Sequence, residues 1–510
     1  MTPNILLIMA DQLAPQFTGT YGHPVVQTPH MDALAARGTR FDAAYCNSPL
    51  CAPSRAAFLT GRLPTATGAY DNAADFASSL PTFAHALRAA GYATCLSGKM
   101  HFVGPDQLHG FEERLTTDVY PADFAWTPDW RDPLTRIDKW YHNMDSVTQA
   151  GPAATTFQIE FDDETTFLAR RRILEYAMSG DGSEFGDGRP FAMVVGLMHP
   201  HDPYVARPEF WDLYPDANVD MPKNPRRADD PHSTRVRQGN EGDRIAASEA
   251  DILSARRGYY ANTSYFDHNV GILIRTLEEA GLTDNTVVIV TSDHGDMLGE
   301  RDLWYKMSWF DHSSRVPLVM AGPGVRPGTW DAPCSLIDLF PTMLDIADAE
   351  HPCHIPLDGR SLWPSATERA PGQTEAIGEY CAECAPGAPV IMLRRDRWKY
   401  IHAAGDPPQL YDLAADPDEL TNLAPDHPVA HDFAVEVAAR WNDATVSAQV
   451  IASQDRRRVI TGALGQGAPT HWDYTPPRDA SQEYVRNHMD WTVAAAKNRW
   501  PPNPHLKVRS

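Results

Sequence analysis

The stretch that organises this chain is residues 46–62, which read CNSPLCAPSRAAFLTGR. Pro53 suits the first turn of a helix, the apolar residues after it are compatible with a helix, and Gly61 is a typical residue at which a helix ends. The pattern predicts that Cys51 stands at a helix N-terminus, where free backbone N–H groups favour anions, with Arg55 one turn further on. An isolated cysteine is more often a buried structural residue, so an anion site with a nucleophile needs support from neighbouring motifs.

Eight positions in this stretch match a signature of the sulfatase family, Cys-x-Pro-Ser-Arg followed by Leu-Thr-Gly-Arg. They are Cys51, Pro53, Ser54, Arg55, Leu59, Thr60, Gly61 and Arg62. In that family the cysteine is oxidised after synthesis to formylglycine, whose hydrated aldehyde is the nucleophile. The resemblance therefore implies that Cys51 is a modification site and that a formylglycine-generating enzyme acts on this chain.

Four apolar runs along the chain each end in a polar cluster: 4–10, 92–96, 191–198 and 286–290. Polar clusters that follow strands gather at the carboxyl edge of an open α/β sheet, where active sites form. Amphipathic segments such as 31–36 and 82–90 lie between the runs. The pattern predicts an α/β fold with a large mixed or parallel sheet and helices on both faces, and the resemblance implies the alkaline phosphatase-like form of it.

Polar residues after the first and last of these runs resemble the metal site of the sulfatase family. That family places an acid after its first strand and an Asp-His or Asp-Asn pair after a late strand, and it binds a divalent cation with them. By this likeness the ligands are Asp11, Gln12, Cys51, Asp293 and His294. The family usually has a second aspartate where Gln12 stands, so this site carries one negative charge fewer than the usual site of the family. Hard carboxylate oxygens favour Ca²⁺, with Mg²⁺ or Mn²⁺ as alternatives, over zinc.

Further cationic residues resemble the groups with which sulfatases hold sulfate. Lys99 and His101 lie in Gly-Lys-Met-His, His201 lies in Pro-His-Asp-Pro, and a lysine follows downstream in the family's order. A sulfate ester needs cations on its non-bridging oxygens, a base that prepares the nucleophile and an acid near the leaving oxygen. A single lysine of this kind could equally be a solvated surface residue. The predicted catalytic set is Cys51, Arg55, Lys99, His101, His201 and Lys306.

Composition narrows the class of partner. The chain has 510 residues, enough for a large core, and a formal net charge of -23, which argues against nucleic-acid binding because no basic stripe would neutralise phosphates. The first ten residues lack a basic segment and a cleavage site and are too short to cross a bilayer. Seven cysteines without regular spacing suit a reducing compartment. We therefore expect a cytoplasmic protein with no membrane partner.

The Pro- and Gly-rich loop near 351–374 predicts a domain boundary. Beyond it, runs at 391–394, 398–401 and 409–413 predict a small antiparallel sheet with one helix, about 429–457, packed on it. The aromatic, Pro-rich tail cannot form its own core, so we expect it to dock on the body or on a second subunit of a homo-oligomer, a dimer or tetramer. The predicted divisions are a catalytic domain at 1–365, a C-terminal α+β subdomain at 366–465 and the tail at 466–510.

The segment 124–143 is dense in aromatic and acidic residues. An aromatic cage with a carboxylate is what a quaternary ammonium group needs, although such a loop can also merely cover a sheet. Blocks at 70–72, 97–118, 140–144 and 486–489 resemble bacterial choline-sulfatases. By that likeness the substrate is choline sulfate, with Asn72 near the ester and a choline pocket lined by Trp126, His142 and Glu383.

Three alternatives stay open at this point. A phosphonate or phosphate ester hydrolase of the same superfamily would use the same nucleophile and metal, and so would an arylsulfatase. A non-catalytic anion-binding protein is the third, and it requires that Cys51 remains a thiol.

Overall fold

The central feature of the fold is an eight-stranded sheet in the order β11-β2-β10-β9-β1-β7-β4-β5. The structure is a computed structural model that describes residues 2–137, 141–180, 186–350, 356–370 and 374–466. β10 runs antiparallel to both of its neighbours, and the other pairs are parallel. The strands are β1 (Asn4–Asp11), β2 (Thr39–Phe41), β4 (Ala93–Gly98), β5 (Glu113–Arg114), β7 (Phe191–Pro200), β9 (Thr286–Ser292), β10 (Leu318–Ala321) and β11 (Gly328–Trp330).

The four apolar runs predicted as strands are β1, β4, β7 and β9, and they are neighbours at the centre of this sheet. Successive side chains of a strand point to opposite faces. In β1, Leu6 and Ile8 therefore pack into the core on one face of the sheet, and Leu7 and Met9 into the core on the other. The predicted α/β fold with a large mixed sheet is confirmed.

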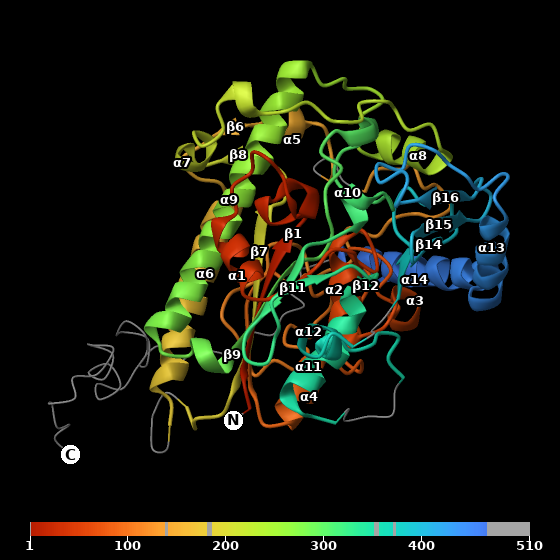
Figure 1. The fold of residues 1–510 in the computed structure, drawn as a ribbon. Helices are drawn as coiled ribbons and strands as arrows, with labels where there is room; N and C mark the ends of the chain where they lie inside the picture. The colour runs from red at the N-terminus through yellow and green to blue at the C-terminus, as the bar shows by residue number, and fades with distance from the viewer. Residues whose placement is uncertain (1, 138–140, 181–185, 351–355, 371–373, 467–510) are drawn as a thin grey trace, which may run out of the picture.

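Helices cover both faces of this sheet, as Figure 1 shows. One face carries α1 (Pro29–Ala36), α6 (Phe157–Met178) and α9 (Glu249–Glu279). The other carries α2 (Cys51–Thr60), α4 (Phe83–Ala89) and α11 (Leu339–Ala347). Shorter elements connect them: β3 (Ala44–Tyr45), α3 (Pro64–Thr67), α5 (Asp145–Thr148), β6 (Gly151–Pro152), β8 (Val205–Ala206), α7 (Pro208–Trp211), α8 (Pro231–Gly239), α10 (Asp311–Ser314), β12 (Cys334–Ser335) and α12 (Trp363–Thr367).

Helix α2 begins at Cys51, as the sequence predicts, and its end is fixed by Gly61. This glycine has φ of 65°, in the left-handed region that favours glycine, and its N–H bonds the carbonyl of Ala57. All ten residues of the helix are buried. A helix start in the core, at the edge of the sheet, is a position from which a nucleophile can be held rigidly.

A second, four-stranded antiparallel sheet follows the catalytic part, with α13 and α14 beside it in Figure 1. Its strands are β13 (Glu375–Tyr380), β14 (Val390–Arg395), β15 (Trp398–Ala403) and β16 (Gln409–Asp412). The last three were predicted. β13 was missed because its glutamates and glycine are rare in strands. Gly378 is needed there, since a Cβ would lie 2.0 Å from the Trp309 ring.

The single helix predicted over about 429–457 is wrong: the structure has α13 (Pro428–Arg440) and α14 (Asp443–Leu464). The chain is extended at Trp441, and the Asn442 side chain then accepts the N–H of Thr445 and caps a new helix. The predicted boundaries at 365 and 465 stay predictions, and the tail falls almost wholly outside the described residues. Among those residues, no helix combines the length and apolar character that a membrane span requires.

Candidate active site

Four of the five predicted metal ligands meet at the carboxyl edge of the sheet. Asp11 ends β1, Asp293 and His294 follow β9, and Cys51 opens α2. Each offers one possible ligand atom, and these atoms lie within 4.8 Å of one another. The Cys51 sulfur is 3.7 Å from Asp11 Oδ1 and 3.2 Å from His294 Nε2. The structure therefore brings Asp11, Asp293 and His294, from the ends of two strands that are far apart in the sequence, to Cys51.

The donors in this cluster suit a divalent cation. His294 donates from Nδ1 to the carbonyl of Gly295 at 3.0 Å, which leaves the Nε2 lone pair facing the cluster. Burial, opposed by Asp293, lowers the pKa of His294 to about 4, so its ring is neutral at pH 7. Two carboxylates and one neutral imidazole are a mainly hard donor set that fits Ca²⁺, Mg²⁺ or Mn²⁺. Burial, reinforced by Asp11, raises the pKa of the Cys51 thiol to about 12, so the encoded side chain is uncharged.

Gln12, the fifth predicted ligand, joins the cluster through its backbone. Its N–H donates to Asp293 Oδ1 at 3.1 Å. Its side-chain amide donates to Asp296 Oδ2 at 2.7 Å, and its Oε1 accepts from Lys306 Nζ at 2.5 Å. A carboxylate accepts and an ammonium donates, so this orientation of the amide is fixed from both sides. The buried negative charge that position 12 lacks is therefore found behind it, at Asp296. Metal ligation by Gln12 stays a prediction.

Arg55 bridges the two carboxylates of the cluster. Its Nε donates to Asp293 Oδ2 at 2.9 Å and its Nη2 to Asp11 Oδ2 at 3.2 Å. Its Nη1 donates to the carbonyl of Lys99 at 2.9 Å, and the whole side chain is buried. Burial alone would raise the pKa of Asp11, but Lys99 and the other neighbouring cations hold it well below its usual range. Arg55 is one of the cations that keep Asp11 ionised, and its predicted contact with sulfate stays a prediction.

Lys99 and His101 follow β4 and lie beside the cluster. The Lys99 ammonium pairs with Asp11 and lies 4.1 Å from the ring centroid of Tyr120. His101 is 3% exposed, and neither of its ring nitrogens has a hydrogen-bond partner within the described part of the chain. Burial, and then Lys99, lowers the pKa of His101 to about 3. A neutral imidazole with no protein partner is available to a ligand.

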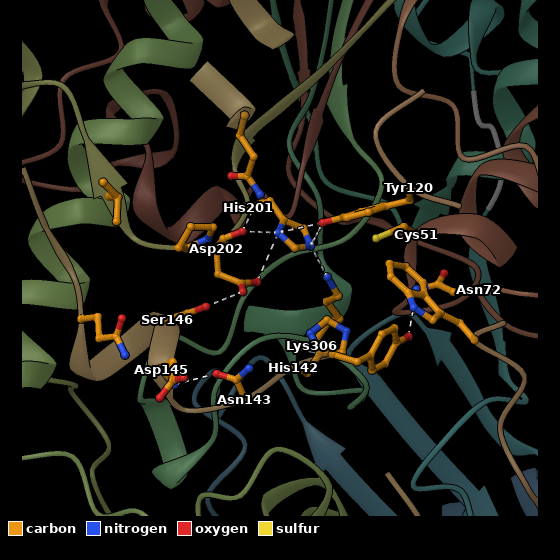
Figure 2. Close-up of a pocket in the computed structure, with 16 residues that line it drawn as sticks. Cys51, Asn72, Tyr120, His142, Asn143, Asp145, Ser146, His201, Asp202 and Lys306 are labelled. Carbon is orange, nitrogen blue, oxygen red and sulfur yellow. Dashed lines mark hydrogen bonds and ion pairs between the residues drawn. The ribbon is translucent and has the colours of Figure 1, made fainter. Parts of the chain in front are cut away.

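His201 and Lys306 form a hydrogen-bonded pair, drawn in Figure 2. His201 Nδ1 faces the carbonyl of Asp202 at 2.7 Å, so it carries the ring proton, and Nε2 accepts from Lys306 Nζ at 2.8 Å. Burial and then Lys306 lower the pKa of His201 to about 4. Burial opposes the charge of Lys306, but nearby groups, Cys51 foremost, raise its pKa. Lys306 is therefore the protonated member of the pair.

A cavity of about 520 Å³ opens beside these groups. One side of it is aromatic: the Trp126 ring centroid lies 5.1 Å from that of Tyr141 and 5.2 Å from that of Tyr120. Figure 2 shows Cys51, Asn72 and Tyr120 on one side of the pocket and the polar residues 143, 145 and 146 on the other. The cavity thus places an aromatic wall next to the predicted nucleophile.

A chain of hydrogen bonds links the start of α2 to a buried acid. Asn72 Oδ1 accepts the N–H of Ala52 at 3.0 Å, and Asn72 Nδ2 donates to the Tyr141 hydroxyl at 3.0 Å. That hydroxyl donates to Glu383 Oε1 at 2.8 Å, and Glu383 Oε2 has no partner among the residues described. Burial raises the pKa of Glu383 to about 7. The predicted residues at 72 and 383 are therefore connected through a tyrosine.

Sequence reasoning missed Tyr120, Tyr141 and Asp202, all of which line the cavity. Tyr141 directly precedes His142 in the chain, and Asp202 directly follows His201. Their position next to predicted site residues was a usable signal. Tyr120 lies in no motif and carried no signal beyond being aromatic. Trp130, from the predicted aromatic segment, lies in the core and donates to the carbonyl of Ala382 at 2.8 Å. Trp140, from the same segment, lies outside the described residues.

Three family models match the chain. The Sulfatase model matches residues 3–349. The model for the C-terminal part of N-sulphoglucosamine sulphohydrolase matches 299–444, and that for the choline sulfatase enzyme C terminus matches 448–500. The sulfatase family generally uses a divalent metal and formylglycine, which agrees with the cluster around Cys51.

Individual relatives point the same way. A choline-sulfatase of Rhizobium meliloti (strain 1021) is 48% identical over 98% of both chains. Arylsulfatase K of Danio rerio is 32% identical over 84% of this chain and 81% of its own. The solved phosphonate monoester hydrolase of Agrobacterium radiobacter has a TM-score of 0.68 at 25% identity, over 88% of this chain and 96% of its own. The chain therefore belongs to the sulfatase family and is a sulfuric ester hydrolase.

Proposed function

We propose that this sulfatase hydrolyses choline O-sulfate to choline and sulfate. The observation that carries the proposal is Glu383, a buried acid with an unpartnered oxygen that is joined by Tyr141 to the aromatic wall beside Cys51. The choline-sulfatase that is 48% identical over nearly the whole chain supports the same substrate.

The aromatic wall suits a quaternary ammonium group. Such a cation cannot donate hydrogen bonds, so it is recognised by ring faces and by a nearby negative charge. Trp126, Tyr141 and His142 supply rings on one side of the cavity. Glu383 supplies the charge when it is ionised. A bound cation favours the ionised form of this acid, whose pKa of about 7 is set mainly by burial.

The reacting sulfate lies, in this proposal, between residue 51 and the cationic side chains. As formylglycine, residue 51 supplies a hydrated aldehyde whose oxygen attacks sulfur. Asp11, Asp293 and His294 would hold a divalent cation, Ca²⁺ by the hardness of the donors, which would supply positive charge to the sulfate oxygens. Lys99 and His101 face the same oxygens from the end of β4, and their position beside the cluster supports this role.

The leaving choline oxygen needs a proton, and the His201–Lys306 pair is placed to give it. Lys306 holds its proton at pH 7 and donates to His201 Nε2 at 2.8 Å. Both side chains line the cavity. Lys306 can pass its proton to an oxygen that leaves toward the aromatic wall, either directly or through Nε2 of His201, while Asp202 keeps the ring of His201 in one orientation.

We also propose the remaining features of the working enzyme. It needs a formylglycine-generating enzyme, because the encoded residue is a thiol. It forms a homo-oligomer and works in the cytoplasm. The six cysteines that the structure describes are free and buried, which suits a reducing compartment.

Comparison of substrates tests the proposal. We expect kcat/KM of the metal-loaded enzyme for choline sulfate to exceed that for 4-nitrophenyl sulfate, although the aryl ester has the better leaving group. The phenyl ester of a phosphonate is the third substrate, because one solved relative is a phosphonate monoester hydrolase. A preference for the aryl sulfate or for the phosphonate would overturn the assignment.

A further inference from the structure

The turn that carries Lys99 and His101 has an unusual backbone. Gly98 has φ of 93°, and His101 has φ of 56° although it is not a glycine. A non-glycine residue in this region costs free energy and persists only where its surroundings hold it. The two ring nitrogens of His101 have no partner among the described residues, so its ring does not hold the turn by hydrogen bonding. Another group must therefore hold the turn in this conformation.

The backbone N–H groups of the turn identify that group. Gly98 N–H donates to Thr116 Oγ1 at 2.7 Å, and Lys99 N–H donates to the carbonyl of Gly196 at 2.9 Å. The remaining two, of Met100 and His101, both donate to one carboxylate oxygen, Oδ2 of Asp118, at 3.0 and 2.8 Å. Asp118 therefore fixes the half of the turn in which the strained residue lies.

Asp118 is itself held as an anion. Its side chain is 8% exposed and pairs with Arg114 Nη2 at 2.7 Å, and its Oδ1 accepts the N–H of Val119 at 2.8 Å. Arg114 is anchored in turn by Gln107 Oε1 at 2.6 Å. Burial opposes the charge, but Arg114 and His101 hold the pKa of Asp118 at about 2. The carboxylate accepts four N–H donors in all, and an asparagine amide would turn its own N–H₂ toward at least one of them.

We propose that Asp118 is a positioning residue for sulfate binding: it holds the turn at Met100 and His101 so that Lys99 and His101 converge on one anion. The segment that it starts adds a second contact, because the ring of Tyr120 lies 4.1 Å from the Lys99 ammonium and its hydroxyl 3.3 Å from His201 Nε2. Asp118 does not line the cavity. The inference rests on the proposed sulfate-binding role of Lys99 and His101.

The chain offers a matched control for this carboxylate. Asp106 also accepts two backbone N–H groups with one oxygen, those of Leu108 and His109 at 3.0 and 3.1 Å. It lies in the loop that follows the turn, and its hydrogen bonds and ion pair within the described part of the chain go to Leu108 and His109, not to Lys99 or His101. Asp118→Asn and Asp106→Asn therefore make the same chemical change in two similar hydrogen-bonded turns, of which one carries the predicted catalytic groups.

The experiment compares inhibition of wild type and both variants by inorganic sulfate and, separately, by choline, with 4-nitrophenyl sulfate as the assayed substrate. Inhibition constants do not depend on what fraction of the enzyme is active. We expect Asp118→Asn to weaken inhibition by sulfate about tenfold, since hydrogen bonds to a charged group are lost, and to leave inhibition by choline within about twofold. Its kcat should fall by about 10- to 100-fold, because misplaced groups lose catalysis steeply. Asp106→Asn should change neither constant.

Unchanged inhibition by sulfate in Asp118→Asn would overturn the proposal, and so would equal weakening by sulfate and choline, which indicates general distortion. If Asp118→Asn does not fold, Arg114→Gln removes the ion pair of Asp118 and should shift the sulfate constant less but in the same direction. An unchanged inhibition constant for sulfate in Arg114→Gln would also overturn the proposed role of Asp118. Failure of choline to inhibit wild type would contradict the proposed substrate, while the sulfate comparison would still decide the role of Asp118.

Discussion

The two halves of this active site are built from different parts of the fold. The anion half consists of Asp11, Cys51, Arg55, Asp293 and His294, which stand at strand ends and a helix start and are at most 1% exposed. The alcohol half consists of Tyr120, Trp126, Tyr141, His142 and Glu383, which lie in connecting segments. Rigid elements hold reacting groups precisely, whereas loops vary without disturbing the sheet. On the proposed assignment of these residues, the core therefore fixes the reaction and the loops choose the alcohol.

Removal of the nucleophile should break the anion half most completely. Cys51→Ala leaves no oxygen to attack sulfur, so we expect kcat to fall by about 10⁴-fold or more for every sulfate ester. Measured turnover of choline sulfate and 4-nitrophenyl sulfate should disappear together. Residual activity within tenfold of wild type on either ester would show that residue 51 is not the nucleophile.

Loss of one carboxylate should disturb the same half through the metal. Asp293 accepts from Arg55 Nε and from the N–H groups of Gln12 and His294. We expect Asp293→Asn to lower the bound divalent cation, measured as metal content of the purified protein, and to lower kcat/KM by about 10²-fold. Added cation should recover part of the activity. Full metal content in the variant would remove Asp293 from the ligand set.

The alcohol half should respond to Glu383→Gln in a substrate-dependent way. The amide keeps the acceptor for the Tyr141 hydroxyl but removes the charge that we propose attracts the ammonium group. We expect KM for choline sulfate at pH 8 to rise about 30-fold, on the order of 2 kcal/mol for a buried charge pair. KM for 4-nitrophenyl sulfate, which carries no cation, should stay within about threefold. An equal rise for both esters would mean that Glu383 acts on shape and not on charge.

A smaller effect should follow from pH. Because burial raises the pKa of Glu383 to about 7, the acid is neutral below that pH and attracts a cation less. KM for choline sulfate should therefore rise by about tenfold as pH falls from 8 to 6, because the ionised fraction of Glu383 falls by about the same factor. The Glu383→Gln variant is the control, and its KM should be flat over this range. The same pH dependence of KM in wild type and in Glu383→Gln would show that a group other than Glu383 titrates.

The sequence predicts the anion half far better than the alcohol half, for a physical reason. Apolar runs locate the strand ends and the helix start, and the resemblance to the sulfatase family selects Asp11, Cys51 and Asp293 there, so these residues could be placed before their contacts were known. The partners of Arg55 could not, because two carboxylates and a sulfate are equally suitable for a guanidinium. Tyr120 could not either, since the path of its loop depends on packing against Lys99 and Trp126. The same holds for β13, whose glycine makes sense only once Trp309 is seen beside it.

The most direct test of the account is the mass of the peptide that spans Cys51, taken from enzyme purified in fully active form. We expect an aldehyde or its hydrate at residue 51, because a buried thiol with a pKa of about 12 is a poor nucleophile at pH 7. An unmodified thiol in a preparation that turns over choline sulfate at its full rate would contradict it.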